Sequence, residues 1–265
     1  MNAVATQDQC ARAPLCPATD TVISVHGLTK RYGEVVAVDA IDFEVRRGSF
    51  TALLGGNGAG KTTTIAILLG LIRPTAGRIH ILGQDFARHA KAVLARMNFQ
   101  SPYADLPRRL TIRQNLMIYA RLYGVTKASE QIQHLARELD LRELLDRPLG
   151  ELSAGQRTRA GLAKAFINRP ELVLLDEPTA SLDPDTADWV RSFLARYAAE
   201  MNATFFIASH NMPEVERLCD SVLMMRSGRV VDSGSPKELI AKYGRTTLED
   251  VFLDVARFGP KDAAG

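Results

Sequence analysis

The fold of this chain is decided by the run Gly55-Gly56-Asn57-Gly58-Ala59-Gly60-Lys61-Thr62. It matches the pattern G-x-x-x-x-G-K-[ST], whose backbone N–H groups wrap around phosphate oxygens. The apolar run 50–54 before it predicts a buried strand, and the run 63–71 after it predicts a helix with a positive N-terminal dipole. A glycine-rich turn without a ligand is the plainer alternative, and the complete match between strand and helix argues against it.

The residue types in this run suit the phosphates of a nucleotide. Glycines let the backbone approach where a Cβ would obstruct it. Lys61 would neutralise the β and γ phosphates, and the Thr62 hydroxyl would ligate Mg²⁺. The other candidate contacts with a bound nucleotide are Gly55, Asn57, Gly58, Ala59, Gly60 and Thr63.

Length and composition exclude several classes of protein. The 265 residues suit one large domain, or a domain with a subdomain. A net charge of +3, with scattered basic residues, does not indicate a nucleic-acid partner. The longest apolar stretch, 65–72, is far below the roughly 20 residues of a membrane span. Three cysteines without C-x-x-C spacing fit a reducing compartment, and residues 1–20, without a signal-peptide core, are expected to be a disordered tail.

The order of apolar runs predicts an α/β core divided by a helical insert. Helical spacing extends from about 101 to 168, where Thr111 and Gln114 form a capping box. The strand candidates 172–175 and 204–208 are almost wholly apolar, as a parallel sheet buried on both faces requires. Further strands are expected at 22–28, 35–45, 78–82, 221–225 and 229–231.

Two carboxylates follow the apolar run 172–175. A buried strand would present Asp176 and Glu177 at its C-terminal edge, where open α/β sheets bind ligands. Asp176 would hold Mg²⁺ through a water molecule, and Glu177 would polarise the attacking water. A solvated strand end is the alternative, and the phosphate-binding loop in the same chain disfavours it.

The segment 152–156 reads Leu-Ser-Ala-Gly-Gln. Ser153 and Gln156 form a capping box at a helix start, and the exposed N–H groups of such a start bind anions. The structural and the anion-binding interpretations are compatible here.

Together, these three motifs resemble those of the ATP-binding cassette (ABC) ATPases over about 22–256. The segment 152–156 is similar to the signature L-S-G-G-Q. The resemblance implies a P-loop NTPase core with a mixed or parallel sheet, an N-terminal antiparallel β subdomain and a helical subdomain at about 101–168. It also implies an ATP-binding domain over 21–243 and a C-terminal helical extension over 244–265.

Four further residues receive roles from this resemblance alone. Tyr32 is similar to the aromatic that stacks on adenine, with a turn tyrosine as the alternative. Gln100 resembles the glutamine that touches Mg²⁺ and water, with a loop amide as the alternative. Asp183 resembles the residue of a loop that crosses the dimer interface, although it would equally cap a helix starting at Pro184. His210 resembles the switch histidine that contacts the γ-phosphate.

Two positions depart from the family pattern. Gly56 replaces a proline, which should loosen the loop without removing a hydrogen-bond donor. Ala154 replaces a signature glycine, and its methyl group would weaken dimer closure if the γ-phosphate must approach the backbone there. We expect ATPase function to survive both changes.

The resemblance also implies partners. Each ATP would lie between Lys61 of one chain and Ser153, Gly155 and Gln156 of another, which implies a homodimer or a paired cassette. The work would be transport through a separate membrane permease, with the chain peripheral on the cytoplasmic face of the cell membrane. The alternative is a non-transport ABC ATPase acting on ribosomes or DNA, whose second cassette, coiled-coil insert or basic linker is not visible here.

Two segments bear on the direction of transport and on docking. The groove formed by 100–110 and the neighbouring helix surface, with Tyr103 and Leu106, is expected to receive a permease helix. The segment 234–256 resembles the ending of ATPases that serve ABC-2 type exporters, with capping boxes expected at 235–238 and 246–249. Its apolar positions, which would also suit a helix folding onto its own core, are Leu248, Val251, Phe252 and Val255.

Overall fold

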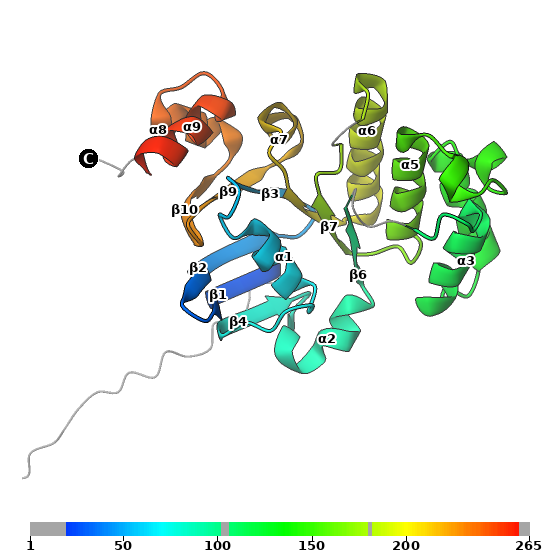
Figure 1. The fold of residues 1–265 in the computed structure, drawn as a ribbon, viewed down its shortest axis with the longest axis horizontal. Helices are drawn as coiled ribbons and strands as arrows, with labels where there is room; N and C mark the ends of the chain where they lie inside the picture. Colours follow the sequence, from blue (N-terminus) through cyan, green and yellow to red (C-terminus); the bar gives the residue numbers. More distant parts are fainter. Residues whose placement is uncertain (1–19, 102–105, 180–181, 260–265) are drawn as a thin grey trace, which may run out of the picture.

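A computed structural model describes residues 20–101, 106–179 and 182–259 of the chain (Figure 1). The expected tail lies outside these residues except for Asp20, as does Tyr103. The strands are β1 (Thr21–Tyr32), β2 (Val35–Arg46), β3 (Phe50–Gly55), β4 (Ala76–Ile81), β5 (Gln84–Asp85), β6 (Met97–Gln100), β7 (Leu172–Asp176), β8 (Thr204–Ala208), β9 (Ser221–Arg226) and β10 (Arg229–Gly234). The α-helices are α1 (Lys61–Leu68), α2 (Phe86–Leu94), α3 (Ile112–Leu122), α4 (Ala128–Glu138), α5 (Ala154–Ala165), α6 (Pro184–Met201), α7 (Met212–Leu218), α8 (Pro236–Tyr243) and α9 (Leu248–Phe258).

The strands form two sheets. The N-terminal sheet is antiparallel, in the order β2-β1-β4-β5. The central sheet has the order β10-β9-β3-β8-β7-β6, in which only the β9–β10 pair is antiparallel. The helical subdomain, α3 to α5, stands to the right of the central sheet in Figure 1. This arrangement confirms the expected mixed central sheet and the antiparallel N-terminal sheet.

Every residue of the central strand β8 is buried, so its sequence is almost wholly apolar and does not alternate with polar residues. Its side chains alternate between two cores on opposite faces of the sheet. Phe205 stacks on Phe50 at a centroid distance of 4.5 Å in the core beneath the helices. Phe206 faces Phe43 of β2 at 5.8 Å in the core shared with the N-terminal sheet. A polar residue at either position would therefore be buried.

Helix α1 differs slightly from its expected span. It begins at Lys61 rather than at residue 63, directly after the glycine run. It ends at Leu68 rather than at 71, because Gly70 has a φ of +70° that a continuing helix does not allow. The expected capping box of α3 is confirmed: the Gln114 N–H donates to the Thr111 hydroxyl at 3.1 Å.

The C-terminal helices pack onto the body of the protein. The expected capping box of α8, at 235–238, is confirmed. The one expected at 246–249 was wrong by one residue, because Thr247 caps α9 and accepts from the Asp250 N–H at 3.2 Å. The apolar face of α9 is buried in the core, so the interpretation as a helix folding onto its own protein is confirmed.

Leu106 does not lie on a docking surface as expected. It is only 6% exposed and belongs to the hydrophobic core beneath the helices. An apolar side chain in an irregular segment next to α3 is stabilised by burial there, so the expectation that Leu106 contacts a partner was wrong.

Candidate nucleotide site

The predicted motifs converge because four parallel strands are adjacent in the central sheet. Strands β3, β8, β7 and β6 lie side by side and point the same way. Their C-terminal ends carry, in that order, the loop 55–62, His210, the pair Asp176 and Glu177, and Gln100. Sequence positions up to 155 residues apart therefore meet at one edge, where ligands of open α/β sheets bind.

The loop 55–62 has the shape of a phosphate cradle. Gly58 has a φ of +77°, and a Cβ there would meet no atom within 4 Å, so the loop leaves open space on that side. Gly60 has a φ of +107°, and a Cβ there would lie 2.6 Å from the Ala37 carbonyl oxygen. Gly60 also caps α1 without a side chain, which leaves the first-turn N–H groups free to bind an anion.

Lys61 and Thr62 open helix α1 at the cradle. The Lys61 Nζ donates to the carbonyl oxygens of Gly55 at 2.5 Å and Gly56 at 3.2 Å. Burial lowers the pKa of Lys61, against the opposing effect of two nearby carboxylates, Glu177 and Asp176. Thr62 is exposed, with its backbone in the first turn.

The two acids after β7 have different surroundings. Asp176 accepts from the Ser101 hydroxyl at 3.4 Å, and burial, with the charge of Glu177, raises its pKa. Glu177 has a φ of +50°, a strained conformation for this residue type, and its N–H donates to the Ala208 carbonyl at 2.8 Å. Because of this turn, the Glu177 carboxylate faces the segment that follows β8.

The Glu177 carboxylate meets the segment after β8. Its Oε1 accepts from the backbone N–H of His210 at 3.0 Å and contacts His210 Nδ1. Its Oε2 accepts from the Ser209 hydroxyl at 3.4 Å. Glu177 is 17% exposed at its side chain and His210 is 76% exposed, so the carboxylate is shielded and the imidazole faces solvent. The structure thus brings together two residues that were expected in the site.

Gln100 ends β6 next to this group, but its side chain turns away from Asp176. Its Nε2 donates to the Ser101 carbonyl at 3.2 Å, and the side chain is buried. The side-chain amide lies in a notch of α5 that exists because Gly161 has no side chain. A Cβ at Gly161 would lie 2.5 Å from that Nε2. In this structure Gln100 therefore neighbours the site without pointing into it.

The signature segment forms a separate surface. Its capping box is confirmed, with the Gln156 N–H donating to the Ser153 hydroxyl at 3.2 Å. A Cβ added at Gly155 would lie 3.5 Å from the Thr186 side chain, and Asp183 caps α6 by accepting from the Thr186 N–H at 2.9 Å. Among the described residues, no hydrogen bond links Ser153 or Gln156 to the loop 55–62. The signature segment and the loop 55–62 are therefore separate surfaces of the chain.

Tyr32 lies at the end of β1, in a hairpin that touches the cradle. The β2 carbonyl of Ala37 is the atom that crowds Gly60. Tyr32 is 48% exposed, and its ring lies 4.9 Å from Lys30 Nζ. An exposed aromatic ring on this hairpin can receive a flat base.

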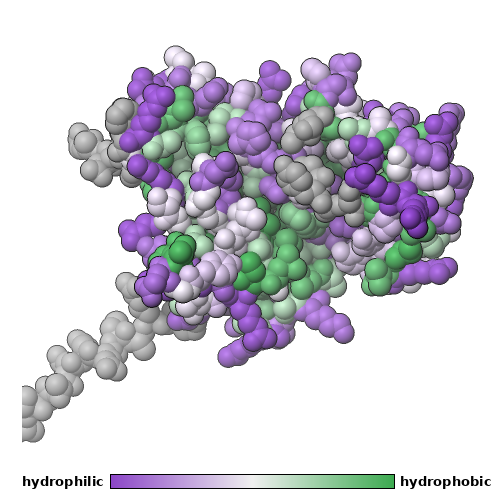
Figure 2. Space-filling view, in the orientation of Figure 1, coloured by the Kyte–Doolittle hydropathy of each residue, from purple (hydrophilic) through white to green (hydrophobic). Residues whose placement is uncertain are grey.

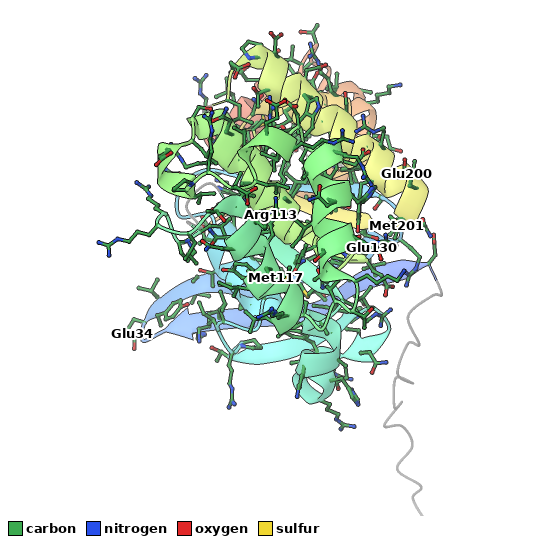
Figure 3. The ribbon with its side chains drawn as sticks, turned by 90° about the vertical axis from the view of Figure 1, so that its right-hand side faces the viewer. Glu34, Arg113, Met117, Glu130, Glu200 and Met201 are labelled. Atoms are coloured by element: carbon green, nitrogen blue, oxygen red, sulfur yellow. The ribbon has the colours of Figure 1, made fainter. Side chains whose placement is uncertain are left out.

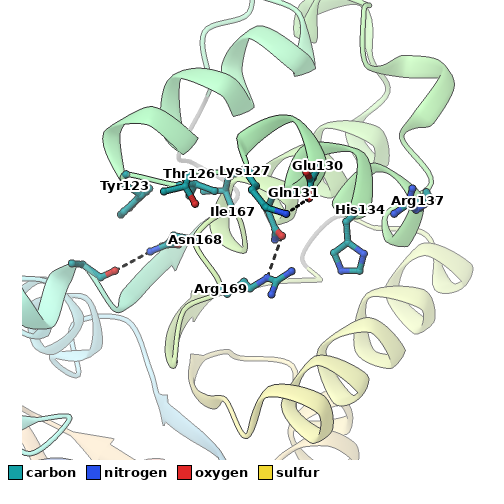
Figure 4. A pocket seen from close by; sticks show the side chains of 13 residues that line it. Tyr123, Thr126, Lys127, Glu130, Gln131, His134, Arg137, Ile167, Asn168 and Arg169 are labelled. Atoms are coloured by element: carbon teal, nitrogen blue, oxygen red, sulfur yellow. Dashed lines mark hydrogen bonds and ion pairs between the residues drawn. The ribbon is translucent and has the colours of Figure 1, made fainter.

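One hollow lies away from this sheet edge. It has a volume of about 610 Å³ and sits where the α3–α4 connection meets the end of α5 (Figure 4). Figure 3 shows this side of the molecule, with Met117 on α3 and Glu130 on α4. Within it, the Arg169 Nε donates to the Gln131 Oε1 at 3.2 Å, and none of the residues expected to bind nucleotide lines it.

Two contact residues of the site were missed from the sequence. Ser101 donates to Asp176, and Ser209 donates to Glu177. Ser101 directly follows Gln100 and Ser209 directly precedes His210, so adjacency to a predicted site residue was the signal that the sequence offered.

The family model described as ABC transporter matches residues 38–180. This chain belongs to the ABC transporter family. The bacitracin transport ATP-binding protein BcrA of Bacillus licheniformis is 38% identical over 86% of this chain and 74% of its own. The Nod factor export ATP-binding protein I of Ralstonia nicotianae is also 38% identical, over 88% of this chain and 73% of its own.

A solved ATP-binding subunit of an ABC transporter superposes with a TM-score of 0.80, at 27% identity, over 89% of this chain and 99% of its own. The expected ABC resemblance is confirmed, and the chain is an ATP-binding ATPase subunit of an ABC transporter. Such subunits work with a membrane permease. Among the described residues, no helix is long and apolar enough to cross a membrane.

Proposed function

We propose that this ABC ATPase hydrolyses Mg²⁺-ATP between two copies of itself and thereby drives export through a separate permease. The observation that carries the proposal is the shared edge of β3, β8, β7 and β6, where the cradle, both acids and His210 meet. The relative named for Nod factor export supports an export direction.

The chain fits Mg²⁺ held mainly by oxygen atoms. Among the described residues, no group of three or more His, Cys, Asp or Glu side chains is arranged to hold a metal ion by itself. Mg²⁺ prefers one or two protein oxygens together with waters and phosphates, which the Thr62 hydroxyl and the Asp176 carboxylate supply. When bound, the ion would neutralise charge on the phosphates. Gln100 would join it only after leaving its notch in α5.

The hydrolytic roles follow from the positions of the side chains. Lys61 would exchange its two loop carbonyls for phosphate oxygens, since these lie at the same cradle. Glu177 would accept a proton from the attacking water or orient it, and its strained, shielded carboxylate suits that task. His210 would contact the γ-phosphate from the exposed side. Positioning and charge stabilisation supply the rate in phosphoryl transfer.

A second copy would complete the site. Within the part of the chain that the structure describes, the exposed N-terminus of α5 at Ser153 makes no hydrogen bond to the cradle. A two-fold dimer would bring Ser153, Gly155 and Gln156 of one copy to the nucleotide of the other, with Asp183 at the interface and Tyr32 at the base. We propose a homodimer because each chain carries both surfaces, located at the cytoplasmic face of the membrane. Residues 21–243 would form the ATP-binding domain and 244–265 its C-terminal extension.

The permease would dock on exposed apolar side chains of the helical subdomain and of the segment that follows α1. Ile118 and Leu122 lie one turn apart on α3 and are 45% and 74% exposed. Leu71, just after α1, is 74% exposed. In Figure 2, hydrophobic surface gathers between α1 and β6 and again over α3. These side chains replace Leu106 as the proposed contacts.

The catalytic proposal is tested with Glu177→Gln. The variant should bind ATP, lose turnover by about 10²- to 10⁴-fold, and elute as an ATP-dependent dimer in size-exclusion chromatography. Without ATP it should elute as the wild type does. Near-normal turnover would refute the role of Glu177.

The transport proposal is tested by recovering partners of tagged Glu177→Gln protein from detergent-solubilised membranes with ATP present. Mass spectrometry should identify a stoichiometric multi-span protein. Leu122→Asp in the same background should lose that partner, whereas Leu253→Asp, an exposed leucine on α9, should keep it. Recovery of ribosomal proteins or DNA-bound factors instead would favour the non-transport alternative.

A further inference from the structure

A buried carboxylate lies behind the hydrolytic site and has no role in the proposed function. Glu214 sits in the first turn of α7, four residues after His210, and is 4% exposed. Burial raises its pKa. A carboxyl group is costly to bury unless its oxygens are hydrogen-bonded, so its partner is informative.

The partner of Glu214 is Thr179, two residues after Glu177. The Thr179 hydroxyl donates to Glu214 Oε2 at 2.6 Å, and Thr179 itself is 7% exposed. The bond joins positions 35 residues apart in the sequence. The second oxygen, Oε1, has no hydrogen-bond partner among the described residues. Both residues are buried, and the Thr179 hydroxyl supplies the hydrogen bond that offsets the cost of burying the Glu214 carboxyl group.

The start of α7 is held firmly. Asn211 caps the helix by accepting from the Glu214 N–H at 3.3 Å. The Asn211 N–H in turn donates to the Ser209 hydroxyl at 3.1 Å, and that hydroxyl donates to Glu177. The position of Glu214 is therefore fixed relative to the segment that meets the Glu177 carboxylate.

Two links thus join the same pair of segments. The first runs from the Glu177 carboxylate to Ser209 and His210, and the second runs from Thr179 to Glu214. Glu177 has a left-handed backbone, and such strain persists only where the surroundings over-determine it. The second link supplies that constraint two residues downstream of the strained residue.

We propose that Glu214 is a positioning residue for ATP hydrolysis: by holding Thr179, it keeps Glu177 in its left-handed turn, with its carboxylate facing His210. The inference rests on the proposed role of Glu177. The charges that act on Glu214 are those of Arg191 of α6, which favours its ionised form, and of Glu177, which opposes it.

The test separates positioning from folding. Thr179→Val removes the donor with little change in shape, and Glu214→Ala removes the acceptor. Each should lower kcat for ATP hydrolysis about tenfold or more while KM for ATP stays within about twofold, because misplacing a catalytic group by a fraction of an ångström slows chemistry. The double variant should be no slower than the slower single variant, because both changes break one hydrogen bond.

Conservative variants should restore the rate. Thr179→Ser keeps the hydroxyl and Glu214→Gln keeps an acceptor oxygen, so both should keep kcat within about threefold of wild type. If the valine or alanine variants do not fold, these two decide the question, and a tenfold loss in both would overturn the proposal. Wild-type kcat in Thr179→Val, or multiplying losses in the double variant, would also overturn it.

Two control variants distinguish a failure of the Glu214 proposal from a failure of the proposed nucleotide site. Thr204→Val removes a buried threonine hydroxyl that accepts from the Gly48 N–H at 3.0 Å, at the opposite end of the sheet. It should leave kcat unchanged, even if thermal unfolding shows a loss of stability. Lys61→Ala measured in parallel should be inactive; unimpaired hydrolysis by Lys61→Ala would refute the site itself, rather than the role of Glu214.

Discussion

Gly60→Ala should destabilise the protein much more than Gly58→Ala, although both alter the same loop. Gly60 has a φ of +107° and its Cβ would lie 2.6 Å from the Ala37 carbonyl oxygen and 3.1 Å from Met225 Cε. Gly58 has a φ of +77° and its Cβ would meet no atom within 4 Å. Backbone strain is common to both variants, and the steric clash belongs to Gly60 alone.

The magnitudes follow from these two contributions. A left-handed backbone costs a non-glycine residue about 1–2 kcal/mol. Overpacking against backbone that cannot move adds about 1–3 kcal/mol at Gly60, for about 2–5 kcal/mol in all. For a chain of 265 residues, each kcal/mol lowers Tm by about 2 °C, so the expected losses are about 4–10 °C for Gly60→Ala and about 2–4 °C for Gly58→Ala.

Differential scanning calorimetry without nucleotide measures both losses, and titration calorimetry with ATP measures binding. Gly58→Ala should fold and yet bind ATP poorly, because its methyl group would enter the open space of the cradle. Equal Tm values for the two variants would refute the claim that the hairpin carbonyl of Ala37 fixes the loop from behind.

Lys61→Ala should abolish tight ATP binding in titration calorimetry, because it removes the ammonium group that lies at the cradle; binding at wild-type affinity would contradict its role. Arg96→Ala should destabilise the protein more at pH 7 than at pH 3. Arg96 donates to Glu171 at 2.6 and 2.8 Å and lowers the pKa of that carboxyl. A lowered pKa adds stability above the ordinary glutamate value of about 4.3, and that contribution disappears as the pH falls through the lowered value. Urea unfolding at both pH values checks this, and an equal loss at pH 3 would contradict it.

The central sheet could be predicted because its strands are short apolar runs next to chemically distinctive motifs. β8 has the bounds expected for it, 204–208, since every residue of it is buried on a two-sided sheet. β6 escaped notice because two of its four residues, Asn98 and Gln100, are polar. Asn98 is buried and donates to the Ala165 carbonyl at 2.5 Å, a partner that no local pattern reveals.

The details of the site depended on contacts distant in sequence. Gln100 turns toward α5 because Gly161, 61 residues later, leaves a notch for its amide. The N-cap of α9 was ambiguous because Thr246 and Thr247 each precede an acid by three residues. Glu216 of α7 accepts from the Leu248 N–H and so selects Thr247. Neither outcome follows from propensity or spacing.

The position of β3 in the sheet has a consequence for synthesis on the ribosome. Both of its neighbours, β8 and β9, lie about 150 to 170 residues later in the chain, and the Phe50 N–H donates to Asp220 at 2.8 Å. At about 5–20 residues per second, that interval takes roughly 10–30 seconds. During this time the nascent β3 strand, with the phosphate loop attached, has neither neighbour. Slower translation would lengthen this exposure, so newly made protein should depend on chaperones more than the finished fold does.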